Sequence, residues 1–87
     1  MMTPYGPPSP FALVIPVPNE CVGLIIGRGG ETIRQLQVKS GAKIQVAKEM
    51  HQVGNMQLRN VFIEGPKEKY ESAKRLIRDV VNEHNKM

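Results

Sequence analysis

Three glycines and an arginine stand at four consecutive positions of this 87-residue chain, Gly27-Arg28-Gly29-Gly30. Glycine has no Cβ atom, so this loop can turn tightly and let another backbone approach closely. A helix is expected to begin at Glu31, and the free N–H groups and positive dipole end of a helix attract anions. Arg28 adds a guanidinium whose shape suits phosphate oxygens. The loop therefore indicates a cradle for a phosphodiester backbone; a plain helix–glycine–helix turn is the alternative.

Catalytic uses of a glycine-rich loop require residues that this chain lacks. The loop has no lysine followed by serine or threonine, as a P-loop requires, and Thr32 stands where the dinucleotide fingerprint needs glycine. Cys21, His51 and His84 are too far apart in sequence to indicate a zinc site or an activated thiol. We therefore expect no enzyme activity, no metal and no cofactor, and we interpret Cys21 as a small hydrophobic residue.

The sequence around the loop predicts a strand and a helix before it and a second helix after it. Residues 11–17 (FALVIPV) are apolar and β-branched, which predicts a strand, and Pro16 places it at a sheet edge because proline cannot donate a ladder hydrogen bond. A helix is expected over residues 20–26, with Asn19 as its N-cap and Gly27 as its end. A second helix is expected over residues 31–40, closed by Gly41.

The remaining pattern completes an α+β fold. Residues 42–46 alternate between apolar and polar and predict a strand, residues 48–57 are interpreted as a loop, and residues 58–64 as a third strand. Residues 67–84 carry apolar side chains at spacings of three and four, which predicts a long amphipathic helix. The order β-α-α-β-β-α is accounted for by a three-stranded antiparallel sheet with three helices against one face.

At this point the chain resembles the KH family. Residues 25–33, Ile-Ile-Gly-Arg-Gly-Gly-Glu-Thr-Ile, match every fixed position of the family signature Ile-Ile-Gly-x-x-Gly-x-x-Ile, and the element order fits type I. The runs VGLIIGRGGETI and GAKIQVA are most similar to KH domains of the far-upstream-element-binding and poly(C)-binding kind. The resemblance covers residues 11–84. It implies a module in which the loop clamps the backbone of about four nucleotides and the bases lie in a narrow apolar groove.

The resemblance also implies which residues form the site. The predicted phosphate clamp is Gly27, Arg28, Gly29 and Gly30. The predicted groove consists of Val22, Gly23, Ile26 and Ile33, with Ile44 and Val46 on the strand side. Arg59 matches a position that often reads a base edge, and Lys48 is placed to reach the nucleic acid. An ordinary core role for Ile33, Ile44 and Val46, and a solvated role for Arg59, remain as alternatives. Asn19 matches a position where some relatives carry an acidic base-reading residue.

The expected partner is single-stranded nucleic acid, RNA in the first place with single-stranded DNA as the alternative. The chain has two tyrosines, two phenylalanines and no tryptophan, and none lies in the motif. Recognition should therefore depend on clamping, aliphatic packing and edge hydrogen bonds rather than on aromatic stacking. The rival interpretation is a KH fold used for protein–protein interaction or dimerisation, with the long mixed-charge helix as a possible protein-binding surface.

Composition is consistent with this expectation. Twelve lysines and arginines against eight acids give a net charge of +4, which is compatible with a polyanionic partner. A single cysteine suits a reducing compartment, so we expect a nuclear or cytoplasmic location, and no uncharged apolar run is long enough to span a bilayer.

We divide the chain into a proline-rich leader or linker (1–10), a KH domain (11–84) and a tail (85–87). The leader suggests one module of a longer multi-KH regulator of RNA processing or transcription, with neighbouring KH domains.

Overall fold

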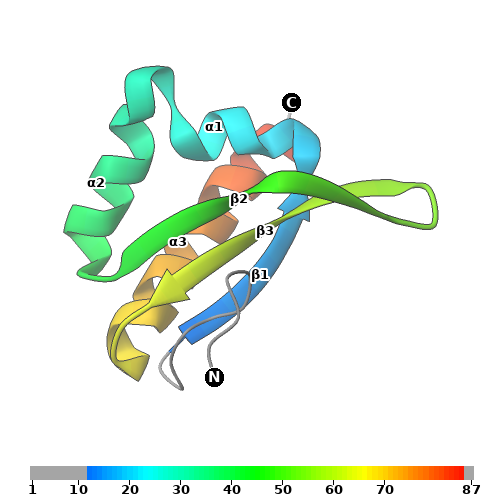
Figure 1. The fold of residues 1–87 in the computed structure, drawn as a ribbon. Coiled ribbons are helices and arrows are strands. Elements are labelled where there is room, and N and C mark those ends of the chain that lie inside the picture. Colours follow the sequence, from blue (N-terminus) through cyan, green and yellow to red (C-terminus); the bar gives the residue numbers. More distant parts are fainter. Residues whose placement is uncertain (1–11, 86–87) are drawn as a thin grey trace.

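The computed structural model describes residues 12–85, and the predicted leader lies outside this range. The elements follow one another as β1 (Ala12–Pro18), the 3-10 turn η1 (Asn19–Cys21), α1 (Val22–Ile26), the 3-10 turn η2 (Arg28–Gly30), α2 (Glu31–Ser40), β2 (Lys43–Val53), β3 (Met56–Glu64) and α3 (Lys67–Asn85) (Figure 1). This confirms the predicted order β-α-α-β-β-α and adds a short 3-10 turn before each of the first two helices.

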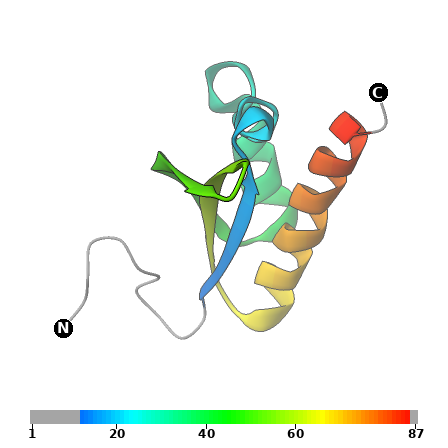
Figure 2. The same ribbon diagram turned by 90° about the vertical axis from the view of Figure 1, so that its right-hand side faces the viewer.

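The three strands form one antiparallel sheet in the order β1-β3-β2. β1 is therefore an edge strand, as Pro16 requires, and β2 is the other edge. Ile63 of the central strand faces Leu13 of β1 and Ile44 of β2 in register. Figure 2 shows α2 and α3 on the same side of the sheet, which leaves its other face uncovered by helices.

The core lies between the sheet and the helices. Each strand and each α-helix contributes a buried apolar side chain to it, and the cluster comprises Val17, Val22, Ile25, Leu36, Ala42, Ile44, Val61, Ile63, Ala73 and Ile77. The alternation predicted for the second strand is confirmed, because Ala42 and Ile44 are buried while Lys43 and Gln45 are exposed. Gly41 ends α2 as predicted, in a left-handed conformation with φ 77°.

The loop predicted over residues 48–57 is wrong. β2 continues to Val53 and β3 begins at Met56, so the two strands form a hairpin around Gly54-Asn55. The pairing register shifts between Val46 and Met50, which indicates a β-bulge. The bulge breaks the two-residue alternation, and the hairpin beyond it is exposed on both faces, so the sequence there has no apolar period.

The N-cap predicted at Asn19 is also wrong. Asn19 lies inside the turn η1 rather than in front of a helix, and α1 begins only at Val22. Neither η1 nor α1 has a side-chain cap within the described range. The Asn19 side chain instead accepts a hydrogen bond from Arg59, forty positions further along the chain. A contact of that sequence separation cannot be read from local spacing.

Burial in the central strand leads to a stability prediction. Ile63 is fully buried, whereas Val38 on α2 is 78% exposed. We expect Ile63→Ala to lower the free energy of unfolding by about 2–5 kcal/mol, because it removes buried methyl groups and leaves a cavity. Val38→Ala, the matched control, should change it by less than about 0.5 kcal/mol. Urea unfolding followed by circular dichroism measures both, and equal effects would contradict the described core.

Candidate functional site

The glycine loop adopts a conformation that depends on its glycines. Gly27, Gly29 and Gly30 have φ angles of 76°, 63° and 79°, in the left-handed region that side chains with a Cβ avoid. The N–H of Gly27 donates to the carbonyl of Gly23 (2.8 Å), so that α1 ends at this residue. The N–H of Gly30 donates to the carbonyl of Gly27 (3.2 Å). The chain thus turns within the four residues 27–30 and enters α2 directly (Figure 1).

Gly27 is constrained by space as well as by conformation. A Cβ atom at this position would overlap the side-chain oxygen of Thr32 and lie 2.8 Å from the backbone nitrogen of the same residue. At Gly29 and Gly30 a Cβ atom would meet no described atom within 4 Å. Gly27 therefore brings the first turn of α2 against the end of α1, while the other two glycines leave the outer side of the loop open.

Arg28 lies at the exposed tip of this loop. Within residues 12–85 the structure has one ion pair, which joins Lys74 and Glu71 on α3 at 3.9 Å. The guanidinium of Arg28 is therefore not neutralised by a described acidic residue. A free cation, a loop without side-chain bulk and the positive end of α2 lie next to one another, and this combination suits an anionic group.

The predicted groove residues differ in how far they can be reached from solvent. Val22 and Ile44 are only 5% and 3% exposed and belong to the core. Ile26, Ile33 and Val46 pack against the core and are partly exposed. Gly23 is exposed on α1, and a Cβ atom there would meet nothing within 4 Å. Val22 and Ile44 thus support the surface from below, while the other residues can contact a ligand.

The free edge of β2 is tied to α2 by a side chain. Gln37 of α2 accepts a hydrogen bond from the backbone N–H of Ile44 through its Oε1 atom, at 2.9 Å. Backbone groups two residues apart on a strand point the same way, so the N–H and carbonyl of Val46 lie on that same outer edge. Local sequence pattern cannot indicate this contact of Gln37, because the contact joins two different elements.

Arg59 is held between two elements. Its Nε–H donates to the Oδ1 atom of Asn19 in η1 at 3.1 Å, and its Nη1 donates to the backbone carbonyl of Ala47 in β2 at 3.1 Å. The prediction placed Arg59 in the site but missed both partners. The solvated alternative for Arg59 does not describe this side chain, which is partly buried and hydrogen-bonded.

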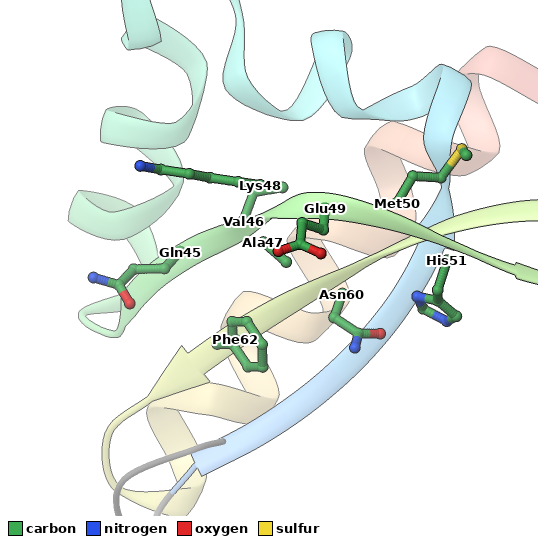
Figure 3. Close-up of a pocket in the computed structure, with 9 residues that line it drawn as sticks. All are labelled: Gln45, Val46, Ala47, Lys48, Glu49, Met50, His51, Asn60 and Phe62. Carbon is green, nitrogen blue, oxygen red and sulfur yellow. The ribbon is translucent and has the colours of Figure 1, made fainter. Parts of the chain in front are cut away.

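Lys48 lies in the bulge of β2, with its side chain on the helix side of the strand, whereas Phe62, Asn60 and His51 lie on the opposite side (Figure 3). A hollow on the sheet surrounds this bulge. It is lined by Gln45, Val46, Ala47, Lys48, Glu49, Met50, His51, Asn60 and Phe62. None of these residues belongs to the glycine loop, so the hollow and the loop are separate features.

Cys21, the last residue of η1, is fully buried. Desolvation by burial, followed by the negative charge of Glu20, raises the pKa of its thiol. The thiol therefore stays protonated at neutral pH, which agrees with the interpretation of Cys21 as a hydrophobic residue. Among residues 12–85, no three His, Cys, Asp or Glu residues cluster as metal ligands would, and no described helix is long and apolar enough to cross a membrane.

Comparisons with known proteins agree with this geometry. The family model described as KH domain matches residues 12–79. The chain is 45% identical over 65 residues to human far upstream element-binding protein 1 and 41% identical over 66 residues to human far upstream element-binding protein 2. These alignments cover 75% and 76% of this chain but only 10% and 9% of the relatives. This chain therefore corresponds to about a tenth of their length.

Two further comparisons extend over more of the chain. The human Tudor and KH domain-containing protein is 41% identical over 80 residues, which is 91% of this chain and 14% of that protein. The solution structure of the first KH type I domain of human vigilin superimposes with a TM-score of 0.61 at 23% identity, covering 99% of this chain and 92% of that one. The vigilin structure supports the fold alone.

The different constraints on the loop glycines lead to a second prediction. Gly27→Ala meets both the left-handed φ and the overlap with Thr32, whereas Gly29→Ala meets only the left-handed φ. We expect Gly29→Ala to lower the free energy of unfolding by about 1–2 kcal/mol, and Gly27→Ala to lower it by clearly more. Thermal and urea unfolding of both variants test this. An equal loss of unfolding free energy would show that the overlap with Thr32 adds nothing to the destabilisation.

Proposed function

The chain belongs to the KH domain family, and we propose that it binds a short stretch of single-stranded nucleic acid, RNA in the first place, without catalysing a reaction. The observation that carries the proposal is the exposed glycine loop, with an unpaired arginine at its tip and the start of α2 directly behind it. The far upstream element-binding proteins are named for binding a far upstream element, which is consistent with the same class of partner.

In this proposal the loop holds the backbone of the strand. Phosphate oxygens approach Arg28 and the N–H groups at the start of α2, because these supply positive charge and free donors. Gly29 and Gly30 have open space on their outer side, so a sugar–phosphate backbone can come into van der Waals contact with the loop. The clamp carries no sequence information, since every nucleotide has the same backbone.

The bases then lie across the surface formed by Gly23, Ile26, Ile33 and Val46. Partly exposed aliphatic side chains provide an apolar contact for the base faces, and the outward backbone groups of Val46 can bond a base edge as they would a neighbouring strand. Lys48 and Arg59 supply charge and donors at the end of this surface. A duplex would not fit, because its bases are stacked and paired and cannot spread over side chains in this way.

The affinity of one such module should be modest. About four nucleotides and few charge contacts suggest a Kd in the range of about 1 μM or weaker. Linking modules in tandem raises the apparent affinity through effective concentration. We infer that this chain functions beside neighbouring KH domains in a regulator of RNA processing or transcription, in the nucleus or the cytoplasm, as its short coverage of longer relatives suggests.

A protein-binding module is the second candidate. Val53 and Met56, which pair with each other at the end of the β2–β3 hairpin, are each 56% exposed. Exposed apolar side chains that gather on a projecting hairpin are a feature of interaction surfaces. A protein partner could also contact the exposed side of α3. In this alternative the glycine loop would not be needed for binding.

A double substitution at the loop tests the primary proposal. We expect Arg28→Asp with Gly29→Asp to lower the affinity for short single-stranded RNA at least about tenfold, because two carboxylates repel the phosphates that the loop would hold. The fold should survive, since Asp tolerates the left-handed region and has open space at Gly29. Fluorescence anisotropy measures binding, and circular dichroism verifies the fold.

The matched control places the same charge change elsewhere. Arg75→Asp with Asn82→Asp alters two exposed positions of α3 and also changes the net charge by −3. This variant should keep most of the affinity, because both positions lie on α3 and outside the loop and the surface proposed to hold the bases. If both double variants lose affinity equally, binding depends only on net charge, and if the loop variant binds as tightly as the parent chain, the clamp is wrong.

A further inference from the structure

The face of the sheet that the helices leave uncovered carries an aromatic ring at its centre (Figure 2). Phe62 of the central strand pairs with Gln45 of β2 and Val14 of β1, and directly paired side chains lie on the same face of a sheet. Val61 and Ile63, on either side of Phe62 in the chain, are buried toward the helices, so Phe62 lies on the open side. The Phe62 side chain is partly exposed, and Val14 beside it is 36% exposed.

The β-bulge makes this open face concave next to the ring. Pairing of β2 with β3 stops at Val46 and resumes at Met50, and Asn60 is the one residue of β3 that faces the three residues between them. The extra length of β2 bends the strand at this point and leaves the hollow described above. Figure 3 shows Phe62 toward one end of the hollow and His51 toward the other.

The side chains of the hollow suit a flat ring with polar edges. Phe62 supplies an aromatic face, and the amides of Gln45 and Asn60 supply donors and acceptors beside it. A nucleobase is such a ring, and stacking on an aromatic side chain tolerates every base because each has a π-face. Phe62 lies outside the motif of residues 25–33, so the expectation of recognition without aromatic stacking concerns the groove and not this face.

The two charged side chains of the bulge leave the strand in different directions. Lys48 extends on the helix side with its ammonium group directed away from Phe62, whereas the carboxylate of Glu49 lies on the side of Asn60 and Phe62 (Figure 3). A phosphate is attracted to Lys48 and repelled by Glu49. A nucleotide at the bulge therefore keeps its phosphate at the edge of β2 and directs its base toward the hollow.

We propose that the hollow is a second nucleobase-binding site, in which a nucleotide beyond the roughly four held by the loop and the groove stacks its base on Phe62 and bonds the amides of Gln45 and Asn60. Val46 and Lys48 line the hollow and also belong to the surface proposed above, so a strand that leaves the groove over the edge of β2 passes the bulge and reaches the open face. This inference extends the proposed function and rests on it.

The test compares RNA strands of two lengths. A short strand of about four nucleotides, selected from random pools for tight binding, occupies the loop and the groove, and the same strand with about four adenosines added at its 5′ or 3′ end can also reach the hollow. We expect one of the two extensions to raise the affinity on the order of five- to tenfold. An extension of abasic nucleotides should raise it by clearly less, because it carries the phosphates without the bases. Fluorescence anisotropy measures each Kd.

Substitutions at Phe62 separate the ring from its apolar bulk. Phe62→Leu keeps an apolar side chain without a π-face, so the extended strand should lose its advantage while the Kd of the short strand stays the same. Phe62→Tyr keeps the ring and should keep the advantage. Val53→Ala, the matched control, truncates an exposed apolar side chain at the hairpin end and outside the hollow, and should also keep it. Urea unfolding verifies the fold of each variant.

NMR gives a second measure of contact at the hollow. Ring protons of Phe62 and the side-chain amide signals of Gln45 and Asn60 should shift with the extended strand and stay in place with the short one, because only the extended strand reaches the open face.

The outcomes for the hollow and for the proposed function differ. An extended strand that gains no more than its abasic counterpart, or a Phe62→Leu variant that keeps the full gain, overturns the second site and leaves the proposed function standing, because the short strand still binds. An equal loss of affinity for both strands in Phe62→Leu also overturns the site, since the ring would then act through the fold. A parent chain that binds neither strand overturns the proposed function and the second site with it.

Discussion

The close approach of Thr32 to Gly27 is the contact on which the rest of the site depends. Because Gly27 has no Cβ, the first turn of α2 lies against the end of α1, and the chain between the two helices is only Gly27 and the three residues of η2. This arrangement places Arg28, the open side of Gly29 and Gly30, and the start of α2 in one small region. In the proposed function, the suitability of the loop for an anion therefore follows from backbone geometry, and the arginine adds positive charge to that geometry.

The same elements serve the core and the surface, and burial divides these roles residue by residue. On α1, Ile25 is fully buried while Gly23 is exposed, and on β2, Ile44 is buried while Val46 is partly exposed. The edge of β2 is held against α2 by Gln37, and its bulge is joined to η1 by Arg59. Polar contacts thus set the position of the strand edge relative to the helices, while the apolar core beneath supplies the stability.

The sequence was sufficient for features whose causes are local or periodic. The glycines at 27, 29, 30 and 41, the alternation over residues 42–46 and the amphipathic period of α3 each have a direct structural meaning, and the element order followed from them. The hairpin over residues 48–57 and the role of Asn19 were missed for physical reasons. A β-bulge disrupts the alternation that marks a strand, and a side chain that bonds a residue forty positions away has no local sequence pattern. Val22 and Ile44 were placed in the groove by the family resemblance, with a core role as the alternative for Ile44, and a matched motif position does not show how deeply its side chain is buried.

The most direct test of the central claim is an NMR titration of the 15N-labelled domain with short single-stranded RNA and DNA pools at two salt concentrations. The account predicts amide shifts at residues 23–33, at Val46 to Lys48 and at Arg59, weaker at the higher salt concentration because phosphate contacts release counterions. An intact spectrum without shifts at these residues, or shifts confined to the hairpin end and α3, would contradict it.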